Sequence, residues 1–153
     1  MKKIYLAGSI SQENRTTMVK VAKLLRENSY EVYCPWELKV ENAWDLPQEE
    51  WAQQVYNADI TAIKECDIFF MISQGRISSA GSNFEHGFAC ALGKPSIVIQ
   101  ITDESTSLMT FCGATQFINC NVDSLHRMVL FMINCVLPFP YRDSNNKCKT
   151  ILT

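Results

Sequence analysis

The sequence predicts an α/β fold, namely a doubly wound, parallel, five-stranded sheet of the flavodoxin-like kind. Short apolar runs alternate along the chain with segments whose apolar residues recur at helical spacing. Such alternation predicts a parallel sheet covered on both faces, and right-handed crossovers then make it doubly wound. The 153 residues suffice for one compact domain and leave little room for a second. We assign that domain to residues 1–138 and expect residues 139–153 to form a C-terminal tail.

Five segments are predicted to be strands because each is a short, mostly apolar run bounded by turn-forming residues. In chain order they are residues 3–7, 30–34, 67–72, 96–101 and 116–119. Gly8 ends the first and Pro35 closes the second. The third is continuously apolar after Asp67, which is typical of a strand buried on both faces. We expect Asp67 itself to have a structural role, such as bonding to the backbone.

Four segments that follow strands have apolar residues at helical spacing or recognisable end signals. In chain order they are residues 13–27, about 47–64, 82–92, and 123 or 124 to 136. Pro47 suits the first turn of the second helix, and Gly93 closes the third. Asp123 or Ser124 is the expected cap of the last.

The composition indicates a small-molecule partner and a reducing compartment. A net charge of -2 leaves no basic surface for a nucleic-acid polymer. The seven cysteines contain no CxxC pair, and neither histidine has a partner at metal-ligand spacing, so we expect no disulfide scaffold, no metal and no cofactor. No apolar run is long enough to span a membrane, and the N-terminus resembles a strand rather than a signal peptide. We therefore expect a cytoplasmic protein that does not bind membranes.

The turn after the first strand is a candidate phosphate site. Ligands of such sheets bind where the carboxyl ends of the strands meet, and Gly8, Ser9 and Ser11 lie in that turn. Backbone N–H groups and hydroxyls beside a helix start suit a phosphate, but a tight turn with a helix cap accounts equally for the pattern. Neither GxGxxG nor GxxxxGK[ST] is present, so a dinucleotide-binding or P-loop site has no motif support.

Two carboxylates and a group of tryptophans are further candidates. Glu85 lies near the start of the helix that follows a loop of small residues, where a surface acid and a catalytic nucleophile are equally compatible with the pattern. Asp59 lies beside apolar helix residues and therefore needs a partner or a function. Trp36, Trp44 and Trp51 cluster in sequence around the loop at residues 35–47, which follows the second predicted strand. They could stack on a base, but ordinary packing accounts for them as well.

Four segments, taken in order, carry a resemblance to a known family. They are IYLAGSI at 4–10, DITAIKECD at 59–67, GSNFEHG at 81–87 and ALGKP at 91–95. Over about residues 3–120 the chain resembles the nucleoside 2-deoxyribosyltransferases and the related 2'-deoxynucleoside 5'-phosphate N-hydrolases.

The resemblance implies roles for individual residues. Glu85 would be the nucleophile that attacks the anomeric carbon, Asp59 a carboxylate that assists departure of the base, and Tyr5 a tyrosine beside the nucleophile. His86 departs from the family, which often has Leu or Ile there. We expect His86 and His126 to be surface or packing residues.

Details of the resemblance favour the hydrolase branch. Gly-Ser follows the first strand where transferases commonly have Gly-Pro, and Ser79 stands six residues before Glu85, where hydrolases carry a serine. Ser107 resembles a serine that a neighbouring subunit places on the phosphate, whereas Ser11 replaces a hydrolase arginine. The expected substrate-binding residues are Gly8, Ser9, Ser11, Ser79, Gly81 and Ser107.

The sequence and the resemblance thus predict an enzyme that cleaves the N-glycosidic bond of (deoxy)nucleoside 5'-monophosphates through a covalent intermediate on Glu85. The close alternative is a 2-deoxyribosyltransferase that exchanges bases on deoxyribose, and a further alternative is a non-catalytic nucleotide-binding module. The last helix carries more apolar side chains than one core face needs, which predicts a homo-oligomer. The resemblance implies that its active sites are shared between subunits.

Overall fold

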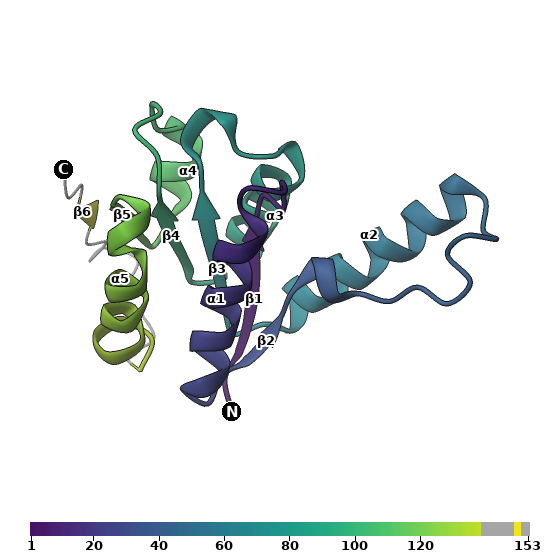
Figure 1. The fold of residues 1–153 in the computed structure, drawn as a ribbon, viewed down its shortest axis with the longest axis horizontal. Coiled ribbons are helices and arrows are strands. Elements are labelled where there is room, and N and C mark those ends of the chain that lie inside the picture. The colour runs from purple at the N-terminus through teal and green to yellow at the C-terminus, as the bar shows by residue number, and fades with distance from the viewer. Residues whose placement is uncertain (139–148, 151–153) are drawn as a thin grey trace.

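In the computed structural model the chain forms a parallel sheet with helices on both faces (Figure 1). The structure describes residues 1–138 and 149–150. In spatial order the strands are β2 (Glu31–Tyr33), β1 (Lys3–Gly8), β3 (Ile68–Ser73), β4 (Ser96–Gln100), β5 (Gln116–Asn119) and β6 (Lys149–Thr150). The first five are the predicted strands, and the order 2-1-3-4-5 is that of flavodoxin-like sheets. The predicted fold class is therefore confirmed.

The two-residue strand β6 lies within the segment predicted to be a tail. It pairs in parallel with β5, so that Phe117 lies opposite Lys149. It extends the predicted five-stranded sheet by one short edge strand, and the rest of the predicted tail lies outside the described residues.

The helices divide between the two faces of the sheet. One face is covered by α1 (Arg15–Glu27) and α5 (Leu125–Phe131), and the other by α2 (Gln48–Glu65), α3 (Ala80–Ala91) and α4 (Leu108–Gly113). Successive residues of a strand point to opposite faces. In β1, Ile4 and Leu6 accordingly belong to the core under α1 and α5, whereas Tyr5 and Ala7 belong to the core under α2 and α3. Figure 1 also shows α2 reaching well beyond the sheet.

Local signals fix the ends of these elements much as the sequence predicts. The Ser79 hydroxyl caps α3 by accepting a hydrogen bond from the Ser82 N–H at 3.2 Å. Gly93, with φ +68°, follows the end of that helix. Asp67 accepts a hydrogen bond from the Lys3 backbone N–H at 2.7 Å, which confirms its expected structural role.

Two helical features differ from the prediction. Helix α4 was not predicted, because this short helix leaves Leu108 and Met109 largely exposed and so lacks an apolar stripe. Ser124, one of the two expected caps, is the N-cap residue of α5, but its side chain makes no capping hydrogen bond. The prediction missed the 3-10 turn before it, which Asn121 caps by accepting from the Ser124 N–H at 2.8 Å. No helix in the described part of the chain combines the length and the apolar character needed to cross a membrane.

Candidate active site

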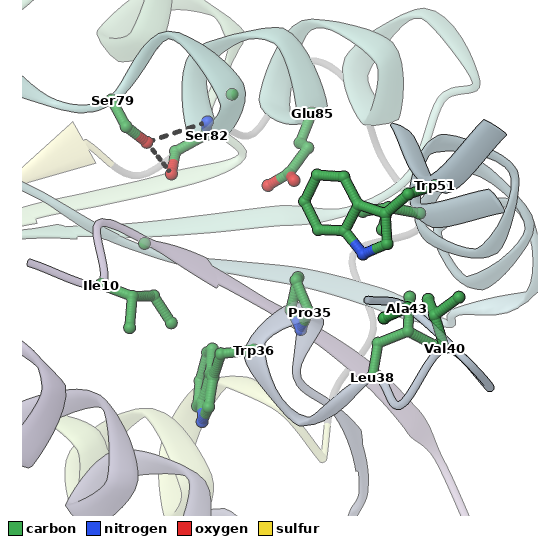
Figure 2. A pocket seen from close by; sticks show the side chains of 13 residues that line it. Ile10, Pro35, Trp36, Leu38, Val40, Ala43, Trp51, Ser79, Ser82 and Glu85 are labelled. Atoms are coloured by element: carbon green, nitrogen blue, oxygen red, sulfur yellow. Dashed lines mark hydrogen bonds between the residues drawn. The ribbon is translucent and has the colours of Figure 1, made fainter. Parts of the chain in front are cut away.

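A cavity of about 490 Å³ opens at the carboxyl ends of β1 and β2, beside the first turns of α3 (Figure 2). The strand order reverses here, because β1 lies between β2 and β3, and open α/β sheets bind their ligands at such points. The lining comes from the turn after β1, the segment after β2, α2 and the start of α3. It consists of Gly8, Ile10, Pro35, Trp36, Leu38, Val40, Ala43, Trp51, Val55, Ser79, Gly81, Ser82 and Glu85.

Glu85 projects its carboxyl from α3 into this cavity (Figure 2). Burial raises the pKa of the carboxyl to about 7; the Tyr5 hydroxyl opposes this effect, and the charge of Asp59 adds to it. Acids with so perturbed a pKa in a cleft are candidate functional groups. Glu85 is thus the acid that faces the space where a ligand would lie.

Tyr5 lies on β1, between β2 and β3, and acts on the Glu85 carboxyl from the sheet. Its ring is stacked between Tyr33 of β2, at 5.3 Å between centroids, and Phe69 of β3, at 5.4 Å. The hydroxyl is buried and has no hydrogen-bond partner of ordinary geometry among the described residues. Burial raises the pKa of this phenol, and the charges of Glu85 and Asp59 raise it further. An unpaired buried hydroxyl beside a carboxyl is a donor available to that carboxyl.

Asp59 approaches the same region from α2 and is fixed by Tyr33. The Tyr33 hydroxyl donates a hydrogen bond to Asp59 Oδ1 at 2.8 Å. Burial raises the pKa of the Asp59 carboxyl, and this hydrogen bond opposes the rise. Asp59 does not belong to the cavity lining, but its charge acts on both Glu85 and Tyr5. The structure therefore brings the three predicted catalytic residues into one electrostatic cluster.

Sequence reasoning missed Tyr33 as a member of this cluster. The signal that could have found it is register, because Tyr33 lies opposite Tyr5 on the neighbouring strand and points to the same face.

Of the predicted substrate-binding residues, three line the cavity. Gly8, Ser79 and Gly81 do so, together with Ser82, which the sequence reasoning did not single out. The hydroxyls of Ser79 and Ser82 are 2.7 Å apart and lie beside Glu85 (Figure 2). They place polar atoms at the start of α3, where the helix dipole is positive.

The other three predicted residues lie outside this lining. Ser9 follows Gly8, and the exposed Ser11 accepts a hydrogen bond from the Asn14 amide at 2.9 Å in the turn before α1. Ser107 caps α4 by accepting from the Thr110 N–H at 3.4 Å. It lines a separate hollow together with Arg76 and Asn83, so the chain does not bring Ser107 to the cavity that Glu85 lines.

The three tryptophans separate in the structure. Trp36 and Trp51 line the cavity, whereas Trp44 is 99% exposed and does not. Apart from these tryptophans, the lining side chains outside α3 and its cap are all aliphatic or proline. They come from the turn after β1, the segment after β2, and α2. The cavity therefore has one polar side, formed by α3, and an apolar remainder.

His86 is a packing residue, as expected. It is a buried residue of α3, and its Nε2 lies 3.0 Å from the Ser96 hydroxyl of β4 while its ring packs on Phe69 of β3. Burial lowers its pKa, which favours the neutral imidazole. Within the described residues, no group of three or more His, Cys, Asp or Glu side chains is placed to hold a metal ion.

A comparison with known protein families identifies the family to which this sequence is similar. The model of the nucleoside 2-deoxyribosyltransferase family matches residues 4–132, which confirms the resemblance seen in the sequence. No significant match is found among curated proteins.

Solved structures of similar fold include a deoxyribosyltransferase and an N-glycosidase. A 2-deoxyribosyltransferase from Bacillus psychrosaccharolyticus is 28% identical, with a TM-score of 0.68 over 80% of this chain and 89% of that one. A CMP N-glycosidase from Clostridium botulinum is 25% identical, with a TM-score of 0.58 over 82% of this chain and 99% of that one. A conserved protein from Enterococcus faecalis V583, 23% identical, matches the fold with a TM-score of 0.58 over 92% of this chain and 80% of that one.

Proposed function

Because this chain belongs to the nucleoside 2-deoxyribosyltransferase family, we propose that it hydrolyses the N-glycosidic bond of nucleoside 5'-monophosphates through a covalent intermediate on Glu85. The observation that carries the proposal is the position of that carboxyl, buried at the edge of a cavity large enough for a nucleotide, with a pKa of about 7. Its ionised form is therefore substantially populated at neutral pH.

The reaction is a double displacement. A Glu85 carboxylate oxygen attacks the anomeric carbon while the bond to the base nitrogen breaks, and the bonding electrons leave with the base, which takes up a proton. A glycosyl ester remains on Glu85. Water then attacks the same carbon, releases the sugar phosphate, and regenerates the carboxylate. Two displacements at one carbon retain its configuration, as in retaining glycosidases.

Asp59 and Tyr5 would assist the two steps in different ways. The raised pKa of Asp59 suits a carboxyl that supplies a proton to the departing base, and the Tyr33 hydroxyl holds its Oδ1 in place. The Tyr5 hydroxyl, unpaired in this structure, would donate a hydrogen bond to the Glu85 carboxylate and keep it aimed at the sugar.

The polar side of the cavity supports a phosphate on the substrate. The hydroxyls of Ser79 and Ser82 lie at the start of α3, and the absence of a side chain at Gly81, where an added Cβ would meet nothing within 4 Å, lets a ligand approach the backbone. No lysine or arginine occurs among the described lining residues, so hydroxyls, amides and the helix dipole would hold the phosphate. Ser107 of a neighbouring subunit is a further candidate, as the resemblance implies.

Base exchange is the second candidate, and the apolar part of the cavity favours it. A surface that holds the departing base can also hold an incoming one, and the 28% identical neighbour is a deoxyribosyltransferase. In that case the second base, rather than water, would resolve the ester.

Incubation with a panel of nucleosides and 5'-monophosphates, with and without an added acceptor base, tests the proposal. We expect free base and sugar phosphate, with release from monophosphates exceeding release from nucleosides. Exchange without net hydrolysis would establish the transferase instead, and binding without turnover would indicate a non-catalytic module.

The variant Glu85→Ala should lose turnover by orders of magnitude. Glu27→Ala, which removes an exposed acid at the end of α1, serves as the matched control. A loss of only a few-fold in Glu85→Ala would contradict the nucleophile role.

A further inference from the structure

Two polar side chains lie buried at the ends of the central strands. Ser73 is the last residue of β3 and Gln100 the last residue of β4, and the two lie opposite one another in the parallel register. Ser73 is 2% exposed and Gln100 is 0% exposed. Because side chains alternate along a strand, they point to the same face as Met71 and Val98, which belong to the core under α2 and α3. Each therefore occupies a position where the strand pattern would otherwise place an apolar side chain.

Gln100 holds the loop between β4 and α4. Its Nε2 donates hydrogen bonds to the backbone oxygens of Thr102 at 3.2 Å and Glu104 at 2.7 Å. Its Oε1 accepts from the Thr106 hydroxyl at 3.1 Å. A buried amide without partners would destabilise the fold, and here both the nitrogen and the oxygen have them. One side chain thus fixes three residues of this loop.

Ser73 holds the turn between β3 and α3 in the same way. Its hydroxyl accepts from the Gly75 N–H at 3.1 Å and lies 3.1 Å from the Ser78 hydroxyl. The Ser78 hydroxyl in turn accepts from the Gln74 N–H at 2.8 Å. The residue after Ser78 is Ser79, which caps α3 and lines the cavity (Figure 2). This turn therefore sets where α3 begins.

The loop and the turn contact each other directly through their backbones. The Arg76 N–H donates to the Ser105 backbone oxygen at 3.0 Å. Gly75 has a φ of +67°, and a Cβ there would lie 2.9 Å from the same oxygen, so no side chain separates the two segments. A displacement of the loop therefore reaches the turn, and through the turn the start of α3, without a flexible side chain to absorb it.

From these contacts we propose that Gln100 is a positioning residue, which acts through the loop 102–106 and the turn 74–78 to hold Ser79 in place for the phosphate of the substrate. This inference rests on the proposed cleavage of nucleoside 5'-monophosphates and adds a residue that lies outside the cavity lining. A methionine would fill a similar volume but could not hold the loop, so the amide can be tested separately from the packing.

The test measures a phosphate preference, defined as kcat/KM for a nucleoside 5'-monophosphate divided by kcat/KM for the same nucleoside, by release of free base. Gln100→Met should lower this preference by about 10- to 100-fold, because a displaced Ser79 hydroxyl loses its hydrogen bond to a charged group. The nucleoside makes no such bond, so its kcat/KM should change by less than about 3-fold. An unchanged preference overturns the inference.

Thr115→Val is the matched control at the opposite end of β4. Thr115 Oγ1 accepts from the Ser96 N–H at 3.0 Å, so this variant also removes a partly buried hydrogen bond of the strand. Both variants should unfold at lower urea concentrations than the wild-type protein, but Thr115→Val should keep the phosphate preference. An equal fall of the preference in Thr115→Val would show that lost stability is the cause, and it overturns the inference.

Thr106→Val tests the same contact with a smaller change and replaces Gln100→Met if that variant does not fold. It removes one of the three hydrogen bonds of Gln100 and leaves the strand as it is. We expect the phosphate preference to fall by about 2- to 10-fold, as the loss of one neutral hydrogen bond implies. An unchanged preference in Thr106→Val overturns the inference.

A double-mutant cycle identifies the route by which Gln100 acts. In a Ser79→Ala background, Gln100→Met should lower the phosphate preference by less than about 3-fold, because the hydroxyl that it displaces is already absent. In a Ser107→Ala background the full effect should remain, since Ser107, which follows the held loop, is the competing route. The opposite pattern overturns the inference.

The proposed function and this inference fail on different results. Release of base by the wild-type protein from none of the substrates, or release without a phosphate preference, contradicts the proposed function itself. Release with a phosphate preference that Gln100→Met leaves intact overturns this inference alone.

Discussion

Replacing Glu85 by glutamine should make the protein more stable at pH 8 and leave its stability almost unchanged at pH 4. The folded protein raises the pKa of this carboxyl from 4.5 to about 7. At about 1.4 kcal/mol per pH unit, that gap corresponds to about 3 kcal/mol. The folded state holds the proton more tightly than the unfolded state, so Glu85 stabilises the fold fully below pH 4.5. That contribution is lost as the pH rises through about 7.

Urea unfolding of the wild-type protein and Glu85→Gln between pH 4 and pH 8 measures this effect. The neutral amide carries no charge into the buried site, so the variant should gain about 3 kcal/mol relative to wild type across the range. Glu27→Gln, at an exposed position, should follow the wild-type curve. If the difference between wild type and Glu85→Gln is the same at pH 4 and pH 8, burial does not raise the pKa of this carboxyl as described above.

Further predictions concern the groups around Glu85 and one turn. Asp59→Asn should move the acid limb of kcat/KM to lower pH, because the charge of Asp59 raises the pKa of Glu85. Tyr5→Phe should move the acid limb to higher pH, because the phenol hydroxyl lowers the pKa of Glu85. If the two variants shift the acid limb in the same direction, Asp59 and Tyr5 do not act on Glu85 as described. Tyr33→Phe should cost about 1–3 kcal/mol in urea unfolding, and a double-mutant cycle with Asp59→Asn should return a coupling energy well above zero. Gly75→Ala should destabilise the fold by about 2 kcal/mol or more, measured by the same unfolding assay. Its φ is +67°, and an added Cβ would lie 2.9 Å from a backbone oxygen of the loop before α4.

The strands and long helices could be predicted because their signals are local. The apolar run of β3 is buried at every position, and the spacing of Met18, Val21, Ala22 and Leu25 matches the buried face of α1. Helix α4 could not be predicted, because six residues are too few to show a helical period and a short helix depends on the packing around it.

The candidate site was only partly predictable, because some of its contacts join residues that are far apart in the sequence. The loop of small residues that runs into its helix made Glu85 a candidate, but that pattern fits a surface acid equally well, and the family resemblance supplied the nucleophile role. The hydrogen bond between Tyr33 and Asp59 joins a strand and a helix 26 residues apart, and only the packing of α2 on the sheet reveals it. Likewise, the sequence placed Ser9 and Ser11 near the site, but which serines face the cavity depends on the turn geometry, and Ser82 does so instead.

In the proposed mechanism, Glu85 becomes covalently bonded to the sugar. Acid quenching during turnover of a slowly hydrolysed nucleoside 5'-monophosphate, followed by proteolysis and peptide mass analysis, tests it most directly. We expect the peptide that contains Glu85 to carry the mass of the sugar phosphate, and this adduct to be absent from Glu85→Gln. Base release with no adduct on that peptide, or an adduct on a different residue, would contradict the mechanism.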